Sequence, residues 1–119
     1  MPGVIFDAFD VVVTQFPFVD RNAEKKRPAV VLSRRDHHGR TGVVLVAMIT
    51  TGRASQWPLD VPVDDLAAAG LKHPCVVRMK LASLDTRRIE RAVGRLGQSD
   101  RQALTVSLSR LMPMDAAGE

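Results

Sequence analysis

The stretch Arg27-Pro28-Ala29-Val30-Val31-Leu32-Ser33 decides how the chain around it folds. The residues after Arg27 are apolar or small, which is the pattern of a strand buried on both faces, and we predict such a strand over residues 28–33. Arg27 stays charged at physiological pH, so its guanidinium needs water, a carboxylate or a phosphate as a partner. An arginine at the beginning of an interior strand is therefore a candidate ligand-binding group.

Short apolar or β-branched runs separated by turn signals predict a series of strands around this one. The runs cover residues 10–16, 28–33, 43–49, 59–63 and 75–81. Pro62 lacks a backbone N–H, so the fourth run is predicted to be an edge strand. The charged segments 18–26 and 34–42 are predicted to be a loop and a turn, and residues 52–56 a flexible stretch. This order of elements is typical of a β barrel or sandwich.

Two helices are predicted beside the strands. Residues 64–70 begin with aspartates, continue through alanines and stop at a glycine, which indicates one or two helical turns. Residues 99–111 begin with a capping-box pattern of Ser99 and Gln102, and leucines recur along them at helical spacing. Residues 85–96 fit a helix or a strand equally well, because a cap-like start is interrupted by two glycines.

Composition limits the classes of protein that the chain can represent. Its 119 residues, 45% of them hydrophobic, suffice for one domain and are too few for two. The longest apolar stretch has seven residues and the start lacks a signal-peptide pattern, so we expect a soluble, cytoplasmic protein. The single cysteine, Cys75, excludes an internal disulfide, and its apolar setting predicts a buried small residue rather than a nucleophile.

Positive charge is concentrated in two blocks of a chain whose net charge is +4 and whose pI is near 10.0. Residues 21–53 hold eight Lys or Arg against two acidic residues, and residues 72–110 hold nine against three. Residues 54–71 hold three aspartates and no base. Polyanions are therefore a natural class of partner, although any single one of these side chains is more simply explained as part of a solvated surface.

Eight short segments resemble, in their order and spacing, those of the MazF/PemK toxins, the ribosome-independent RNA-cleaving half of bacterial toxin–antitoxin pairs. The segments are residues 9–12 (FDVV), 16–18 (FPF), 27–33 (RPAVVLS), 47–50 (AMIT), 57–61 (WPLDV), 69–71 (AGL) before Pro74, 76–78 (VVR) and 89–96 (IERAVGRL). Each segment alone is weak, and the resemblance rests on all of them together over about residues 9–111.

The resemblance implies a fold, an activity and a set of partners. The fold is mainly β with α, a small SH3-like β barrel closed by a C-terminal helix, which implies that residues 89–96 form a strand. Members of the family are homodimers that cut single-stranded RNA at short sequences by attack of a 2′-hydroxyl on the adjacent phosphate, without a metal. A cognate antitoxin with an acidic flexible segment is the expected protein partner, and no cofactor is expected.

The resemblance also implies roles for two residues. Arg27 matches the catalytic arginine, whose fork of donors suits the charge that builds on the phosphoryl oxygens. Thr50 matches the catalytic threonine, whose hydroxyl would orient the phosphate, with Thr51 as its possible substitute. The simpler structural explanations are an ion pair of Arg27 with Glu24 or Asp20, and a local backbone hydrogen bond for Thr50.

The general base is not identified by the resemblance. Arg78 matches an arginine that some members use near the cleaved phosphate, but Met79 and Lys80 follow where a carboxylate is expected. Glu24, Asp20 and His37 remain candidates for the base. His37 and His38 lack the spacing of a zinc site, so no metal is expected.

An RNA-binding groove is predicted along the first basic block. Trp57 is either a platform for a stacked base or a plug at the end of the barrel. The predicted RNA-binding residues are Lys25, Lys26, Arg34, Arg35, Thr51, Arg53 and Trp57. Two alternatives remain, a gyrase-poisoning toxin of the same fold and a catalytically inactive module that binds an antitoxin.

Overall fold

The computed structural model describes residues 5–15, 26–52 and 57–113. Within them, six strands form one antiparallel sheet in the order β4-β5-β3-β2-β1-β6. The strands are β1 (Asp10–Gln15), β2 (Lys26–Val31), β3 (Val43–Thr51), β4 (Val61–Pro62), β5 (Cys75–Asp85) and β6 (Ile89–Arg95). The helices are α1 (Arg35–Thr41), α2 (Leu66–Ala69) and α3 (Gln98–Leu111), with a 3-10 turn, η1, at Thr86–Arg88.

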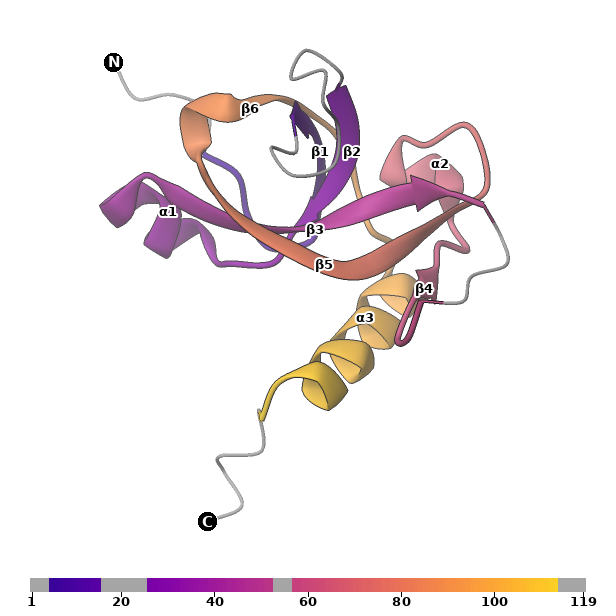
Figure 1. Cartoon of the computed structure of the whole chain (residues 1–119). Helices are drawn as coiled ribbons and strands as arrows, with labels where there is room; N and C mark the ends of the chain where they lie inside the picture. Colours follow the sequence, from indigo (N-terminus) through magenta and orange to yellow (C-terminus); the bar gives the residue numbers. More distant parts are fainter. Residues whose placement is uncertain (1–4, 16–25, 53–56, 114–119) are drawn as a thin grey trace.

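The sheet is strongly curled, which agrees with the predicted class of a small β barrel with helices (Figure 1). Its ladder is open, because β4 and β6 are the two edges of the strand order. The short strand β4 contains Pro62 and pairs with β5 alone, so the predicted edge strand is confirmed. The segment 89–96, which fitted a helix or a strand, forms strand β6, as the resemblance implied.

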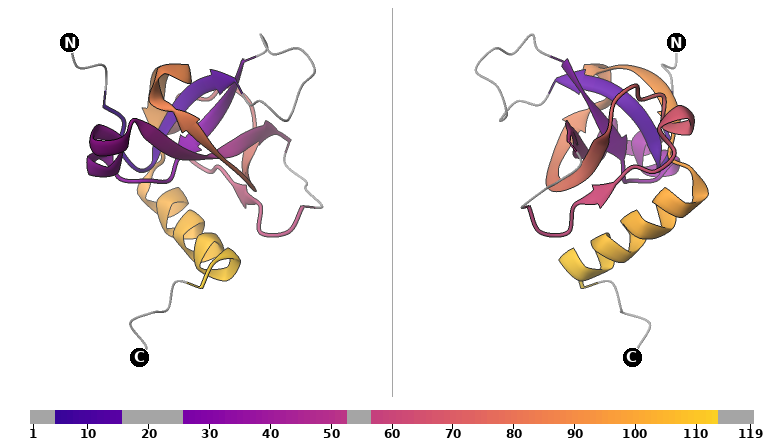
Figure 2. Two further views of the ribbon diagram at one scale, coloured as in Figure 1. Left: turned by 60° about the vertical axis from the view of Figure 1, so that its left-hand side comes forward. Right: turned by 90° about the vertical axis from the view of Figure 1, so that its right-hand side faces the viewer.

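Both faces of the sheet are buried, each by its own cluster of side chains. The first, called here the α3 cluster, contains Val11, Val30, Ala47, Ile49, Val61, Val63, Ala69, Cys75, Val77, Met79, Leu96, Leu104 and Leu108. The second, called here the Phe6 cluster, contains Phe6, Val12, Ala29, Val31, Val44, Val46, Met48, Ala82, Leu84 and Ile89. Figure 2 shows α3 lying across one side of the curled sheet. Strand β2 supplies alternate residues to both clusters, which confirms the prediction of a strand buried on both faces.

Strand β2 begins earlier than its apolar pattern suggests. Its pairing with β1 continues past Pro28 to match Arg27 with Thr14 and Lys26 with Gln15. The strand also ends at Val31 rather than at Ser33. Arg27 is therefore the second residue of the strand rather than the residue before it. The pairing with β1, and not the apolar run, sets where the strand begins.

Residues 34–42 were predicted to be a turn, and this prediction is wrong, because helix α1 occupies most of them. The helix ends at Gly42, whose φ of 72° is left-handed and whose N–H donates to the His38 carbonyl at 2.8 Å. His38 is buried, its Nδ1 donates to the Phe6 carbonyl at 2.8 Å, and its Nε2 accepts from the Ser33 hydroxyl at 2.6 Å. A buried polar side chain, rather than an apolar stripe, thus holds this helix against the fold.

The other two helices follow the sequence more closely. Asp65 caps α2 by accepting from the Ala68 N–H at 3.1 Å, and Gly70 ends the helix, as predicted. Helix α3 begins at Gln98 after Gly97, which makes no side-chain cap, so the prediction of Ser99 as the N-cap is wrong. The nearby Asp100 is buried instead and accepts hydrogen bonds from the loop that precedes α2.

A close contact joins the end of α2 to β6. Gly70 has a φ of 72°, and a Cβ atom there would lie 2.1 Å from the Val93 carbonyl oxygen. A Cβ atom at Gly94 would lie 2.5 Å from the Ala68 carbonyl oxygen. Both positions therefore require glycine, because the two backbones lie so close together that no Cβ atom fits between them.

Two further expectations concern Cys75 and the membrane. Cys75 is 8% exposed and belongs to the α3 cluster, as predicted, and burial raises the pKa of its thiol. None of the described helices is long and apolar enough to cross a lipid bilayer.

Candidate active site

Arg27 of β2 and Thr50 of β3 lie in neighbouring strands and project from the same face of the sheet, and this pair of positions is called here the row of Arg27 and Thr50. The ladder between β1 and β2 pairs Thr14 with Arg27, and the ladder between β3 and β5 pairs Thr50 with Val76. Between β2 and β3, the paired residues end at Ala29 opposite Met48, and Arg27 and Thr50 each lie two residues beyond that pair on their own strand. Directly opposed residues of antiparallel strands project from the same face. The sheet therefore places the two sequence-predicted catalytic residues on one face, in neighbouring strands.

The face that carries this row is the one that α3 leaves uncovered. Side chains alternate along a strand, so Arg27 shares its face with Ala29 and Val31 of the Phe6 cluster. Residues on the other face, such as Val30, pack in the α3 cluster. Arg27 and Thr50 are both partly buried. A charged guanidinium and a hydroxyl thus lie at the end of an apolar core, where water is restricted and electrostatic interactions are stronger.

Arg78 lies on the same face, one row away. Thr50 pairs with Val76, and Arg78 follows two residues later on β5. The register of β3 and β5 shifts between Ala47 and Ile49, so that Met48 faces the three residues from Arg78 to Lys80. Met79 is buried in the α3 cluster, which places Arg78 and Lys80 on the opposite face, beside Thr50.

A carboxylate does accompany Arg78, but it comes from a distant part of the chain. Arg78 Nη2 donates to Asp60 Oδ2 at 3.0 Å, and its Nε donates to Asp60 Oδ1 at 3.4 Å. The Asp60 side chain is only 6% exposed and that of Arg78 is 22% exposed. The resemblance implied a carboxylate shortly after Arg78, where Met79 and Lys80 stand instead. Asp60 thus brings a carboxylate close to that position from another part of the chain. Because both of its oxygens face Arg78, it is better suited to hold the guanidinium than to accept a proton.

Trp57 completes this part of the site. The Arg78 Cζ atom lies 5.2 Å from the centroid of the Trp57 ring, and Lys80 Nζ lies 6.0 Å from it. Trp57 is 42% exposed, so it lies at the surface and is not a plug inside the barrel. Cations at these distances attract the negative face of an indole ring. The sequence analysis singled out Trp57 and Arg78 but missed Asp60. The only signal for Asp60 was its place in the predicted edge strand over residues 59–63, and in the structure it comes just before β4.

Some predicted RNA-binding residues lie on other surfaces. Lys26 forms an ion pair with Glu90 of β6, and the hydrogen bond from Lys26 lowers the pKa of that carboxyl. By strand alternation, Lys26 and Thr51 project from the face opposite to Arg27 and Thr50. Both side chains are exposed, and neither is positioned by the fold to contact the phosphate that Arg27 and Thr50 would hold.

Arg34, Arg35 and His37 are separated from the row of Arg27 and Thr50. Arg34 is the residue before helix α1, and Arg35 and His37 lie within it. The helix comes just before the start of β3, whereas Thr50 is near the end of that strand (Figure 1). A nine-residue strand spans about 30 Å, so His37 is poorly placed to act as the general base. Other candidates fall outside the described residues. These are Asp20, Glu24, Lys25 and Arg53.

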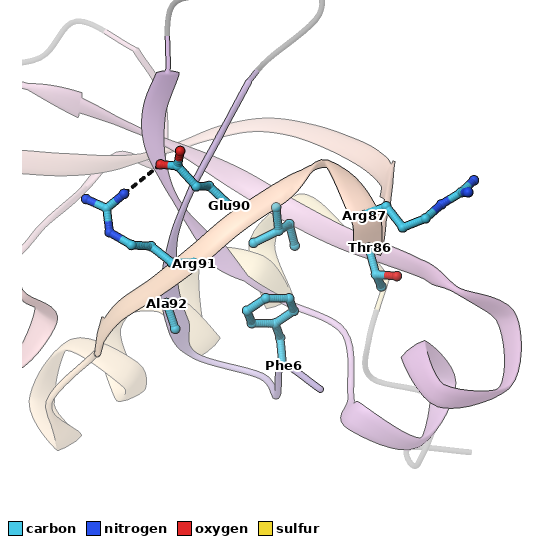
Figure 3. Close-up of a pocket in the computed structure, with 7 residues that line it drawn as sticks. Phe6, Thr86, Arg87, Glu90, Arg91 and Ala92 are labelled. Carbon is cyan, nitrogen blue, oxygen red and sulfur yellow. Dashed lines mark hydrogen bonds and ion pairs between the residues drawn. The ribbon is translucent and has the colours of Figure 1, made fainter. Parts of the chain in front are cut away.

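Among the described residues, one hollow lies against β6 and does not include Arg27. A pocket of about 470 Å³ is lined by Phe6, Thr86, Arg87, Ile89, Glu90, Arg91 and Ala92. Figure 3 shows Phe6 beneath β6, with Arg87 and Arg91 extending away from each other and Glu90 paired to Arg91. In the same region, hydrogen bonds from Arg87 lower the pKa of Asp85 to about 2. These groups are already paired with one another, and the pocket does not contain the predicted catalytic residues.

The described residues contain no cluster of three or more His, Cys, Asp or Glu side chains that could hold a metal ion. His38 is occupied by Ser33 and Phe6, and the centroids of the His37 and His38 rings are 6.4 Å apart. The side chains of Arg27 and Thr50 can offer fixed positive charge and hydrogen-bond donation toward an anion.

The fold and this site define a small protein whose curled antiparallel sheet carries Arg27, Arg78 and Lys80 on one face. A family model described as the PemK-like, MazF-like toxin of type II toxin–antitoxin systems matches residues 7–112, and the chain belongs to that family. A search of curated proteins found no match to the chain.

Solved structures with the same fold agree with this assignment. The Mycobacterium tuberculosis toxin MazF-mt6 is 27% identical, with a TM-score of 0.68 over 85% of this chain and 93% of that one. A chain of the MazE–MazF complex of Deinococcus radiodurans is 25% identical, with a TM-score of 0.73 over 93% of this chain and 99% of that one. A mycobacterial structure described as an endoribonuclease with its cognate antitoxin is 12% identical and shares the fold, with a TM-score of 0.67 over 89% and 91% of the two chains.

Proposed function

We propose that this toxin is a sequence-selective endoribonuclease that cleaves single-stranded RNA without a metal. The observation that supports the proposal is that Arg27 and Thr50 project from one face of the sheet, the face opposite to the one that α3 covers. Arg78 supplies a second guanidinium on that face. Two guanidinium groups and a hydroxyl, half-buried beside an apolar core, form a site for a phosphodiester.

The reaction is an attack of the ribose 2′-oxygen on the adjacent phosphorus. The P–O2′ bond forms, the bond from phosphorus to the 5′-oxygen breaks, and the products are a 2′,3′-cyclic phosphate and a 5′-hydroxyl. A base takes the 2′ proton, and the leaving 5′-oxygen takes a proton from a water molecule. The carboxylate of Glu24, in the segment between β1 and β2, is the proposed base.

Arg27 acts on the charge that builds up on the phosphoryl oxygens. Its guanidinium cannot lose a proton near neutral pH, so it donates hydrogen bonds rather than protons. Thr50 orients the phosphate through its hydroxyl, and Arg78 binds the neighbouring backbone. Removal of one such donor costs about 10² to 10³ in the rate of cleavage.

The proposed partners follow from the same face and from the family. Single-stranded RNA would lie along the face that carries Arg27, Thr50 and Arg78, because its unstacked bases can be read by side chains there. A second copy of the chain would complete the groove as a homodimer. The relative from Deinococcus radiodurans is described as a complex of MazF with MazE, and we propose that a cognate antitoxin with an acidic segment blocks the corresponding face of this toxin.

The experiment is a cleavage assay with Arg27→Ala and Arg27→Lys variants whose folding is checked by circular dichroism. We expect Arg27→Ala to lose cleavage by a factor of about 10² or more, and Arg27→Lys to keep part of the activity because it keeps the charge but loses the planar fork. Full cleavage by a folded Arg27→Ala variant would contradict the proposed mechanism. A DNA supercoiling assay with gyrase tests the alternative of a gyrase poison.

A further inference from the structure

One buried histidine joins three segments of the chain through a continuous line of hydrogen bonds. The Leu45 N–H of β3 donates to Ser33 Oγ at 2.8 Å, and the Ser33 hydroxyl donates to His38 Nε2 at 2.6 Å. On the other side of the ring, Nδ1 donates to the Phe6 carbonyl at 2.8 Å. His38 is 4% exposed. The segment 5–9, helix α1 and strand β3 therefore meet at this imidazole.

This line of hydrogen bonds, called here the His38 latch, fits the neutral imidazole. A carbonyl oxygen can only accept, so the ring proton lies on Nδ1 and the lone pair of Nε2 faces the Ser33 hydroxyl. A second proton on Nε2 would make that nitrogen a donor. The Ser33 hydroxyl would then have to turn its hydrogen away from His38, in a place where unpaired polar groups are costly. The latch is complete while His38 is neutral.

No counter-charge for a protonated His38 is present in the part of the chain that the structure describes. The hydrogen bonds of its ring go to Ser33 and Phe6, and no carboxylate there forms an ion pair with it. The titratable and charged groups on the elements around it are Asp7, Arg34, Arg35, Asp36, His37, Arg40, Asp85 and Arg87.

The carboxylates among these groups are engaged elsewhere or exposed. Asp7 accepts from the Ala8 and Arg35 N–H groups, Asp85 is paired with Arg87, and Asp36 is exposed. The centroid of the His37 ring lies 6.4 Å from that of His38, so a protonated His37 would add a like charge. A charged His38 would therefore be buried without compensation, which costs free energy.

The latch holds Phe6 and α1 in place. The Phe6 ring is 4% exposed and packs in the Phe6 cluster beside residues such as Val44 and Leu84. Figure 3 shows this ring beneath β6. The segment 5–9 and α1 share one further hydrogen bond, from the Arg35 N–H to Asp7 Oδ1 at 3.2 Å. Opening of the latch would therefore free the two segments together and uncover one end of the Phe6 cluster.

We propose that the His38 latch is a proton-sensitive device, in which protonation of His38 releases the segment 5–9 and helix α1 from the sheet while the α3 cluster stays packed. Histidine ordinarily gains its second ring proton as the pH falls through about 6.5. In an opened molecule His38 gains it freely, whereas the closed latch has no place for it. The closed state is therefore fully favoured above about pH 6.5 and loses stability as the pH falls below that value.

The other titratable group that joins the two segments acts at a much lower pH. The hydrogen bond from the Ala8 N–H, and after it that from the Arg35 N–H, lower the pKa of Asp7 below its ordinary 3.8. Its contribution to stability is present above pH 3.8 and is lost as the pH falls through the lowered pKa. Asp7 therefore stays ionised between pH 7.5 and 5.5. His37 and His73 are exposed and serve as internal controls in that interval.

The test is amide hydrogen exchange of the full chain, followed by NMR at pH 7.5 and 5.5 and corrected for the intrinsic pH dependence of exchange. The reporters are the N–H groups of Leu45 and Gly42, which donate to Ser33 Oγ and to the His38 carbonyl. We expect the open fraction at both reporters to rise about 5- to 10-fold at pH 5.5, since that pH is one unit below 6.5. The buried Leu104 of α3 should show no such change.

Two variants at adjacent positions separate the latch from other effects of acid. His38→Gln and His37→Gln each replace an imidazole by a polar side chain that cannot gain a proton. His38→Gln should open more often at pH 7.5 and lose the pH dependence, whereas His37→Gln should keep it. A measurement on the wild type needs no variant. The ¹⁵N shifts of its imidazoles at pH 7.5 should show the His38 proton on Nδ1 and a bare Nε2.

Three results would overturn the proposal. The first is exchange at Leu45 and Gly42 that is equal at the two pH values, or a pH dependence that survives in a folded His38→Gln variant. The second is a His38 ring that carries its proton on Nε2. The third is an equal rise at Leu104, which would show that acid unfolds the whole chain rather than one segment. None of these measurements uses RNA, so their outcome is independent of the proposed function.

Discussion

Arg27 of β2 and Thr50 of β3 project from the same face of the sheet, each two residues beyond the pair of Ala29 and Met48. The two residues are far apart in sequence, and they share a face because both strands extend beyond their most apolar part. Thr50 also pairs with Val76 of β5, whose next residue on that face is Arg78. The sheet register, and not a local motif, therefore assembles the candidate active site.

The first prediction compares two adjacent threonines. Thr50→Val removes a hydroxyl from the face of Arg27 and should lower RNA cleavage by about 10²-fold, the order found for loss of one oriented donor. Thr51 projects from the opposite face and is exposed, so Thr51→Val should change cleavage by less than about threefold. The measurement is the single-turnover rate on a short RNA. A larger effect at Thr51 than at Thr50 would show that the proposed face is wrong.

The second prediction concerns the buried carboxylate of Asp100. It accepts from the Asp64 N–H at 2.9 Å and from the Asp65 N–H at 3.0 Å, and it is 1% exposed. Asp100→Ala should therefore lower the free energy of unfolding by about 2 to 3 kcal/mol. Ser99→Ala, at the neighbouring exposed position that makes no cap, should change it by less than about 0.5 kcal/mol. Urea denaturation measures both, and equal losses would contradict the observed cap.

The third prediction uses two glycines in different surroundings. Gly70→Ala places a Cβ 2.1 Å from the Val93 carbonyl oxygen at a φ of 72°, and should cost at least about 2 kcal/mol of stability. Gly39 lies within α1 with nothing within 4 Å of its Cβ position, so Gly39→Ala should be neutral or stabilise the protein by up to about 1 kcal/mol. Thermal unfolding followed by circular dichroism tests the pair. A Gly70→Ala variant as stable as the wild type would contradict the contact between α2 and β6.

The fourth prediction concerns the pH dependence of Cys75. Burial raises the pKa of its thiol above the ordinary value of 9.0, so the folded state favours the neutral form. The associated stability is present below pH 9.0 and is lost as the pH rises through the raised pKa. At pH 8 a thiol reagent should modify Cys75 much more slowly in the folded protein than in guanidinium chloride. Equal rates in the two conditions would show that Cys75 is accessible.

The strands and two of the helices could be predicted from the sequence because each has a local cause. The valines of β1 and β2 mark buried strands, and Asp65 and Gly70 delimit α2. Helix α1 was missed because its one buried residue, His38, is polar. The hydrogen-bond partners of His38 are Ser33, which lies outside the helix, and Phe6, which is far away in sequence. Local pattern does not report a helix that tertiary hydrogen bonds hold in place.

The candidate site was only partly predictable for a related reason. Arg27 and Thr50 were found through the resemblance, but their common face follows from a register that spans three strands. Asp60 was missed because it reaches Arg78 from 18 residues away, across the pairing of β4 with β5. Conversely, Arg34 and Arg35 are near Arg27 in sequence, yet the length of β2 separates them from it in space.

The central claim is that the chain is a metal-independent endoribonuclease. Its most direct test is incubation of the purified protein with a long single-stranded RNA in EDTA, followed by mapping of both ends at every cut. We predict cuts at a recurrent short sequence, with a 2′,3′-cyclic phosphate on one fragment and a 5′-hydroxyl on the other. Intact RNA under these conditions, or cleavage that appears only when a divalent metal is added, would contradict the account.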